Sequence, residues 1–322
     1  MSLKNKSVLV TGGAGFIGSH LVDRLIKEQP ERLTVVDNLF LGKESNLDDA
    51  KKRFFGLNFL KRDATCAIEL RDIMENEGVD VVFNLAVIPL PASLKEPSWV
   101  FRENTEITLT MCELARQDAF KTLIHFSSSE AYGTSVSGAM DENHPLNGTT
   151  PYAASKAACD LLIKSYQETF GIDASIIRPF NNYGTRQNDG NYAGVIPLTI
   201  KRIMNKKAPV IFGDGKQTRD YLYVTDTVGA AVKIYLCEGT RKKVINIASG
   251  KEVRIDRLLK MIADIMGFKG EILHEPDRWA DVRRHIANIY LAEDLIDFKP
   301  TVELRDGLKQ TVDWYVKESI KE

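Results

Sequence analysis

Short runs rich in Val and Ile alternate with helix-like segments through the first half of the chain, and this alternation restricts the fold more than any other feature. Strands buried on both faces are apolar throughout and bounded by turn residues, as a parallel sheet covered by helices requires. The pattern predicts an α/β fold with a doubly wound parallel sheet. The expected strands are Ser7–Gly12, Leu33–Asp37, Asn58–Asp63, Asp80–Ala86, Thr122–Ser128 and Ala174–Pro179, and the expected helices include Ile17–Glu28 and Asn104–Gln117.

The pattern loosens after about residue 180, where Asn182–Gly194 is loop-like and Phe212–Tyr221 is expected to form a turn. Val244–Ala248 is expected to be one more buried strand, and Arg254–Gly267 and Leu304–Glu318 to be helices. We therefore expect a sheet domain over residues 1–180, with a segment near 220–250 returning to it. Residues 181–322 would form a smaller, irregular lobe.

The composition, with 43% hydrophobic and 27% charged residues among 322, is typical of a soluble globular protein. A formal net charge of -1 provides no overall field that would attract nucleic acid or an anionic membrane. The four cysteines are far apart and form no C-x-x-C pair, so we expect no metal site and no disulfide. The first residues lack a long apolar stretch, and no run approaches the ~18 residues of a membrane helix, so we expect a cytoplasmic protein.

A glycine-rich turn, "VLVTGGAGFIGSHL", places Gly12, Gly15 and Gly18 between the first strand and the first helix. Glycines allow a tight turn and a close approach of the backbone to a pyrophosphate, which the helix N-terminus then binds with free N–H groups. The next strand ends in Asp37, whose carboxylate can accept hydrogen bonds from the adenosine ribose and repel a 2′-phosphate. These features predict a dinucleotide site that prefers NAD to NADP.

A tyrosine and a lysine lie at the start of another expected helix. With Thr150 as N-cap and Pro151 at the first helical position, Tyr152 and Lys156 are four residues apart on one helix face. A free tyrosine has a pKa of about 10, and a nearby ammonium favours the phenolate. Tyr152 could therefore act as a base near neutral pH, and Lys156 could also hold the nicotinamide ribose.

Together, "TGGAGFIG", "YAASK" and the serine cluster "HFSSSEAYG" resemble the extended short-chain dehydrogenase/reductase family. "RPFNNYG", "PVIFGDGKQTRDYLYVTD" and "ADVRR" resemble its nucleotide-sugar epimerase/dehydratase branch, and the similarity covers essentially the whole chain. The resemblance implies a Rossmann-like domain that binds NAD, a C-terminal lobe that binds a nucleotide-diphospho-sugar, and a homodimer. The dimer would form through a four-helix interface from Asn104–Arg116 and Tyr152–Gln167.

The resemblance also implies a role for each residue at a matching position. The catalytic residues would be Ser128, Ser129, Glu130, Tyr152 and Lys156. The NAD site would comprise Gly12, Gly15, Phe16, Ile17, Gly18, Asp37, Asn38, Asp63, Leu85, Ala86, Asn104, Ser127, Tyr152, Lys156 and Pro179. The substrate would contact Asn181, Val195, Arg219 and Arg283, and two arginines suit the oxygens of a diphosphate.

The glutamate of the serine cluster favours one reaction of the branch. In the family, a catalytic Ser or Thr lies four residues before the tyrosine of a "VYG"-like turn, which selects Ser128 by its distance from Tyr132. Glu130 lies where 4,6-dehydratases and some decarboxylases keep a glutamate. After oxidation at C4 of the sugar, such a carboxylate removes the C5 proton, the C6 hydroxyl leaves, and hydride returns to C6. We therefore expect an NAD-dependent 4,6-dehydratase of an NDP-hexose, with UDP as the preferred nucleotide.

Two departures from the family pattern leave other reactions open. Ser129 stands where many sugar dehydratases have an aspartate, and Asn84–Pro97 differs from the usual run in the sugar-facing loop. The alternatives are a UDP-sugar 4-epimerase and a decarboxylase or 5,6-dehydratase, the decarboxylase using Arg186 or Arg284 as its cation. A catalytically silent dinucleotide-binding regulator is a further alternative, which the intact Ser128, Tyr152 and Lys156 disfavour.

Overall fold

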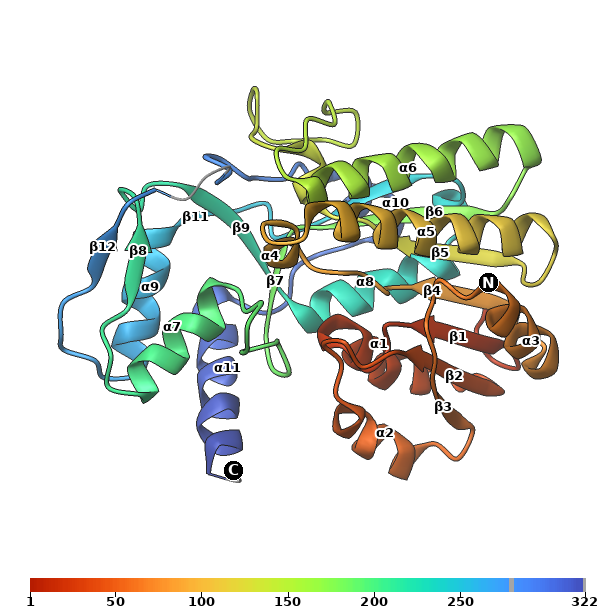
Figure 1. The fold of residues 1–322 in the computed structure, drawn as a ribbon, viewed down its shortest axis with the longest axis horizontal. Coiled ribbons are helices and arrows are strands. Elements are labelled where there is room, and N and C mark those ends of the chain that lie inside the picture. Colours follow the sequence, from red (N-terminus) through yellow and green to blue (C-terminus); the bar gives the residue numbers. More distant parts are fainter. Residues whose placement is uncertain (278–280, 321–322) are drawn as a thin grey trace.

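A seven-stranded parallel sheet forms the centre of the computed structural model, which describes residues 1–277 and 281–320 (Figure 1). Its strand order is β10-β6-β5-β4-β1-β2-β3, and every neighbouring pair is parallel. The strands are β1 (Ser7–Thr11), β2 (Arg32–Asp37), β3 (Leu57–Lys61), β4 (Val81–Asn84), β5 (Thr122–Phe126), β6 (Ala174–Pro179) and β10 (Val244–Ile247). The predicted α/β fold with a doubly wound parallel sheet is confirmed.

Helices cover both faces of this sheet (Figure 1). One face packs against α3 (Ala67–Glu77), α5 (Pro97–Arg116) and α6 (Pro151–Phe170), and the other against α1 (Phe16–Ile26), α8 (Val224–Leu236) and α10 (Tyr290–Ile296). Successive strand residues point to opposite faces: Val8 and Val10 belong to the core on the α1 side, and Leu9 to the core on the α5 side. Because both faces are buried, the strands are apolar at nearly every position.

The rest of the C-terminal chain forms smaller elements beside the sheet (Figure 1). A three-stranded sheet has the order β11-β9-β7, and a two-stranded sheet pairs β12 with β8. These strands are β7 (Asn181–Tyr183), β8 (Val210–Phe212), β9 (Thr218–Tyr223), β11 (Glu252–Arg254) and β12 (Leu273–Glu275). The helices α7 (Val195–Met204), α9 (Ile255–Ile265) and α11 (Leu304–Ser319) contribute Ile200, Leu259 and Leu308 to a separate apolar core. Two further short helices, α2 (Asp48–Arg53) and α4 (Leu90–Ser93), lie in loops after β2 and β4.

The local predictions for individual elements have mixed outcomes. The strand expected at Val244–Ala248 is confirmed as β10, which pairs with β6 at the edge of the central sheet. The turn expected over Phe212–Tyr221 is wrong in its second half, because β9 begins at Thr218 and pairs with β7 and β11. The helix expected from Asn104 begins at Pro97, a residue suited to the first helical turn.

All four cysteines are free thiols. Among the described residues, no helix combines the length and apolar character that crossing a membrane requires. Ala280, the first residue of the "ADVRR" motif, lies outside the described residues.

Candidate active site

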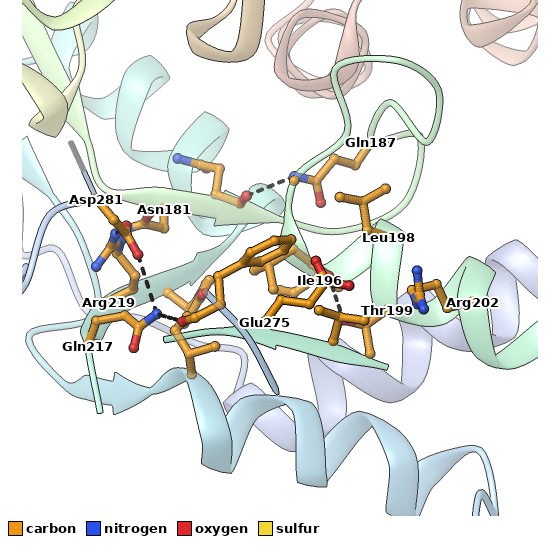
Figure 2. A pocket seen from close by; sticks show the side chains of 17 residues that line it. Asn181, Gln187, Ile196, Leu198, Thr199, Arg202, Gln217, Arg219, Glu275 and Asp281 are labelled. Atoms are coloured by element: carbon orange, nitrogen blue, oxygen red, sulfur yellow. Dashed lines mark hydrogen bonds and ion pairs between the residues drawn. The ribbon is translucent and has the colours of Figure 1, made fainter. Parts of the chain in front are cut away.

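Two cavities adjoin each other, and the first lies at the carboxyl ends of the central strands, where ligands bind in open α/β sheets. The turn cavity has a volume of about 390 Å³ and is lined by the glycine turn and the segments that follow β2 to β6. The α7 cavity has a volume of about 430 Å³ and is lined by residues of α7, β8 and β9 (Figure 2). Asn181, Asn182 and Gln187 line both cavities, which are therefore neighbours.

The glycine turn lines the turn cavity with Gly12, Gly15, Phe16, Ile17 and Gly18, all predicted cofactor residues. Gly12 has a φ of +67°, and a Cβ there would lie 2.8 Å from the backbone nitrogen of Ala86. A Cβ on Gly18 would collide with the carbonyl oxygen of Gly12. The close contact of turn, helix and β4 end therefore requires glycine at both positions.

Two predicted cofactor residues with carboxylate side chains, Asp37 and Asp63, line the turn cavity at the ends of β2 and β3. Asp37 accepts hydrogen bonds from the backbone N–H groups of Ala14 at 3.0 Å and Leu39 at 2.8 Å. Burial raises the pKa of Asp37, and these hydrogen bonds oppose the rise. Asp63 accepts a hydrogen bond from the side chain of Asn38 at 3.0 Å, so Asn38 and Asp63 form one polar edge of the cavity.

The end of β4 brings Leu85 and Ala86 to the turn cavity, as predicted, and Ser127 and Pro179 line it from β5 and β6. Asn104 is the exception, because it is buried behind the cavity and is not among its lining residues. Its Oδ1 accepts a hydrogen bond from Ile88 N at 2.8 Å, and its Nδ2 donates to Ile88 O at 3.1 Å. Asn104 therefore holds the backbone of the cavity wall and does not itself face the cavity.

All five predicted catalytic residues line the turn cavity: Ser128, Ser129, Glu130, Tyr152 and Lys156. Ser128 Oγ accepts a hydrogen bond from the backbone N–H of Glu130 at 3.2 Å, and its side chain interacts with Tyr152 and acts to lower the pKa of that tyrosine. Thr150 caps α6 by accepting from Ala153 N at 3.1 Å, which fixes the helix that carries Tyr152 and Lys156.

The electrostatics of the tyrosine differ from the expectation. Burial raises the pKa of Tyr152, the interaction with Ser128 opposes this rise, and the nearby Glu130 adds to it. The expected lowering by Lys156 is therefore wrong for the protein alone. Lys156 is buried and donates from Nζ to the carbonyl oxygen of Phe126 at 2.8 Å, and burial lowers its own pKa.

Glu130 lines the turn cavity and interacts electrostatically with charged residues of the α7 cavity. Burial raises its pKa, the positive charge of Arg219 opposes that rise, and Asp281 adds to it. Arg219 and Asp281 both line the α7 cavity, whereas Tyr152 lines the turn cavity. A carboxyl group with a raised pKa, close to a tyrosine, is suited to accept and release protons.

Three of the four predicted substrate residues line the α7 cavity: Asn181, Val195 and Arg219. Arg219 donates to Thr218 O at 2.9 Å and forms an ion pair with Asp281, and both charged side chains lie near Asn181 (Figure 2). Val195 is the first residue of α7.

Arg283, the fourth, is not among the lining residues of either cavity. Its exposed side chain forms an ion pair with Asp214, with N–O distances of 2.8 and 2.9 Å. Sequence reasoning missed Arg202, which lines the α7 cavity at the end opposite Arg219 (Figure 2). Two helical turns separate Arg202 from Val195, so the spacing along α7 could have indicated that they share a face.

Comparison with known proteins agrees with this arrangement. Residues 8–248 match the model of the NAD dependent epimerase/dehydratase family. The chain belongs to the NAD-dependent epimerase/dehydratase family. The predicted family and its cofactor, NAD, are thereby confirmed, and the glycine turn with Asp37 fits such a dinucleotide.

Relatives within the family differ in their reactions. The UDP-glucose 4-epimerase of Mycolicibacterium smegmatis is 33% identical over 97% of this chain and 99% of its own. A dTDP-glucose 4,6-dehydratase of Streptomyces antibioticus is 30% identical over 96% of this chain and 92% of its own. The solved structure of a UDP-N-acetylglucosamine 4-epimerase from Methanobrevibacter ruminantium is 36% identical, with a TM-score of 0.90 over 98% of this chain and 99% of that one.

Proposed function

We propose that the protein is an NAD-dependent nucleotide-sugar 4,6-dehydratase that acts on an NDP-hexose, with UDP as the preferred nucleotide. The observation that carries the proposal is Glu130, whose carboxyl group lines the turn cavity beside Tyr152 and interacts with Arg219 of the α7 cavity. A hexose that bridges the two cavities would place its reacting carbons near this glutamate.

Binding of the substrate would rely on the α7 cavity. Arg219 and Asn181 would donate hydrogen bonds to the diphosphate, because charged and amide N–H groups suit phosphate oxygens. Arg202 supplies a second positive charge at the opposite end of the same cavity. The nucleoside would then occupy the far part of the cavity, beside Val195 and Phe212.

The chemistry would begin at C4 of the sugar. Bound NAD would supply a hydride acceptor for C4 and later a hydride donor for C6. Tyr152 would take the proton of the 4-hydroxyl, helped by Ser128, which acts to lower the pKa of the tyrosine, and Lys156 would hold the nicotinamide ribose. Glu130 would then remove the C5 proton, which the 4-ketone acidifies, and the C6 hydroxyl would leave as water.

The departing hydroxyl needs a proton as well. Ser129 lines the cavity where many dehydratases have an aspartic acid, and a serine hydroxyl is a much weaker acid. We infer that Glu130 returns the proton that it took from C5 to the leaving hydroxyl, and that a proton from solvent, delivered through the same carboxyl group, adds to C5 when hydride returns to C6. The raised pKa of Glu130 favours such a shuttle, because the protonated form must persist between the two transfers.

A 4-epimerase is the second candidate, because both reactions occur among the relatives at similar identity. The epimerase of M. smegmatis shares 33% identity with this chain, and a dTDP-glucose 4,6-dehydratase of an Actinoplanes strain shares 32%. Epimerisation would use Ser128, Tyr152 and Lys156 but needs no base at C5. A decarboxylase has less support, because Arg186 is ion-paired with Asp23 at 2.8 Å and Arg284 with Glu252 at 3.0 Å.

Product analysis tests the proposal. The protein is incubated with UDP-, dTDP-, GDP- and CDP-hexoses in deuterated water. A dehydratase forms a 4-keto product that is lighter by one water, absorbs in alkali and carries deuterium at C5. An epimerase forms a product of unchanged mass without deuterium at C5, and that result would reject the dehydratase assignment.

A further inference from the structure

His285 is fully buried behind both cavities and contacts a site residue with each of its ring nitrogen atoms. Its Nε2 lies 3.1 Å from the carbonyl oxygen of Ser129, the residue before Glu130. Its Nδ1 lies 3.5 Å from Nδ2 of Asn181, which lines both cavities. The ring also packs against Phe180, with centroids 5.2 Å apart. One side chain therefore connects the turn Ser129–Tyr132, called the catalytic turn below, with the predicted substrate residue Asn181.

These contacts require one tautomer of the neutral ring. The carbonyl oxygen of Ser129 can only accept, so Nε2 must donate, and the amide Nδ2 of Asn181 then donates to Nδ1. Burial lowers the pKa of His285 to about 3, and the positive charge of Arg219 contributes to this shift. The ring stays neutral at ordinary pH, so it acts as a fixed donor and acceptor and not as an acid or base.

The backbone around His285 is anchored on two sides. Ile286 O accepts a hydrogen bond from Met140 N at 2.9 Å, and Ala287 N donates to the buried carboxylate of Asp220 at 3.3 Å. The ring therefore projects from a segment that is held at Met140 and Asp220, and backbone atoms of Arg283 and Arg284 also join this segment to Thr134 and Ser135, just after the turn. A displacement of the turn relative to this segment would break the hydrogen bond to His285.

We propose that His285 is a positioning residue that fixes the Ser129–Glu130 turn relative to the amide of Asn181, so that the C5 base and the bound sugar nucleotide are aligned. The proposal rests on the proposed role of Glu130 at C5. His285 acts through Ser129 and Asn181 and does not touch the substrate. A misplacement of about 1 Å in an active site can cost on the order of 10²-fold in rate, so loss of this link has a measurable cost.

The test compares His285→Phe, which keeps an aromatic ring beside Phe180 but loses both hydrogen bonds, with His285→Gln, which keeps a donor and an acceptor. His274→Phe is the control, because His274 is an exposed histidine on β12 whose Nδ1 lies 2.7 Å from the carbonyl oxygen of Gly213. The readouts are kcat, KM, reduction of bound NAD in a single turnover, and deuterium exchange at C5.

We expect His285→Phe to raise KM and to reduce C5 exchange by about 10–100-fold more than it reduces hydride transfer. We expect His285→Gln to recover part of both, and His274→Phe to behave as wild type. The inference is overturned if His285→Phe matches wild type, or if all its readouts fall together with the folded fraction seen by circular dichroism.

Failure of the proposed function gives a different result. In that case wild type itself forms a product of unchanged mass, and C5 exchange is absent in every variant. KM then decides the inference: a selective rise in His285→Phe, with recovery in His285→Gln, supports the link to Asn181, and an unchanged KM rejects it.

Discussion

Arg178 donates a hydrogen bond from Nε to Asp160 Oδ2 at 2.7 Å, and both side chains are almost completely buried. Arg178 belongs to β6 and Asp160 to α6, one helical turn beyond Lys156. Nη1 of Arg178 also donates to the hydroxyl of Tyr132 at 2.7 Å, at the end of the catalytic turn. This ion pair therefore ties the helix of the catalytic tyrosine to the sheet and to the turn that carries Glu130.

Removal of the negative charge from this pair should destabilise the protein strongly. Asp160→Asn leaves the Arg178 charge buried without its partner, which typically costs about 3–5 kcal/mol. The exposed pair Lys309–Asp313 provides the control, because Asp313→Asn should change stability by less than about 1 kcal/mol. Urea unfolding of both variants checks the prediction, and equal midpoints would contradict it.

Stability should also fall on the acidic side of neutrality because three histidines, His20, His125 and His285, are neutral in the folded state. Burial lowers the pKa of His20 to about 4 and that of His285 to about 3, from an ordinary value of 6.5. At a pH between the folded and the unfolded pKa of a histidine, the unfolded chain binds more protons than the folded one. The histidines therefore do not reduce the free energy of unfolding above about pH 6.5, and they reduce it increasingly as the pH falls below that value. His20→Gln should flatten this dependence, as measured by urea unfolding near pH 5 and near pH 7.5.

Much of the fold could be predicted because its signals are local. The central strands are apolar runs that end in turn residues, and the glycine turn joins a strand directly to a helix. The start of α6 could be predicted from Thr150 and Pro151, which supply the N-cap and the first helical residue. By contrast, β9 pairs with β7 and β11, which are distant in sequence, so residues from Thr218 onward carried no local sign of a strand.

Whether a residue lines a cavity could be predicted where a motif fixes its position along the chain, and less so where the direction of its side chain depends on packing. The five residues from Ser128 to Lys156 that we assigned to catalysis line one cavity. Asn104 instead bonds to the backbone of Ile88, and Arg283 pairs with Asp214, because both directions depend on neighbours far along the chain. The raised pKa of Tyr152 was missed because burial depends on the assembled fold.

Asp37 should determine the preference for NAD. Loss of a hydrogen bond to a charged group costs about 1.5–3 kcal/mol, so Asp37→Ala should weaken NAD binding by a factor on the order of 10–100. The same change removes the repulsion of a 2′-phosphate and should leave NADP binding unchanged or stronger. Titration of the reduced cofactors by fluorescence checks this, and an unchanged ratio of the two affinities would disprove the assignment.

The protein should form a homodimer through α5 and α6, which lie side by side on one face of the sheet (Figure 1). Phe101 on α5 and Leu161 on α6 expose 39% and 59% of their surface, and a second copy would cover them. Leu161→Asp should yield a monomer in sedimentation at micromolar concentration. Val316→Asp on α11, where Val316 is 40% exposed, should leave the dimer intact. A monomeric wild type would count against the interface.

Glu130 should separate water loss from hydride transfer. Glu130→Gln keeps the shape and the hydrogen-bonding capacity of the side chain but cannot take the C5 proton, so water loss should slow by a factor on the order of 10²–10⁴. Oxidation at C4 should persist, because Ser128, Tyr152 and Lys156 remain, and reduced nicotinamide should accumulate in the absorbance spectrum. Tyr152→Phe is the contrasting variant and should stop both steps, since the first transfer needs its base. Turnover and C5 deuterium incorporation near wild type in Glu130→Gln would make Glu130 a turn residue only, and the epimerase would then become the better assignment.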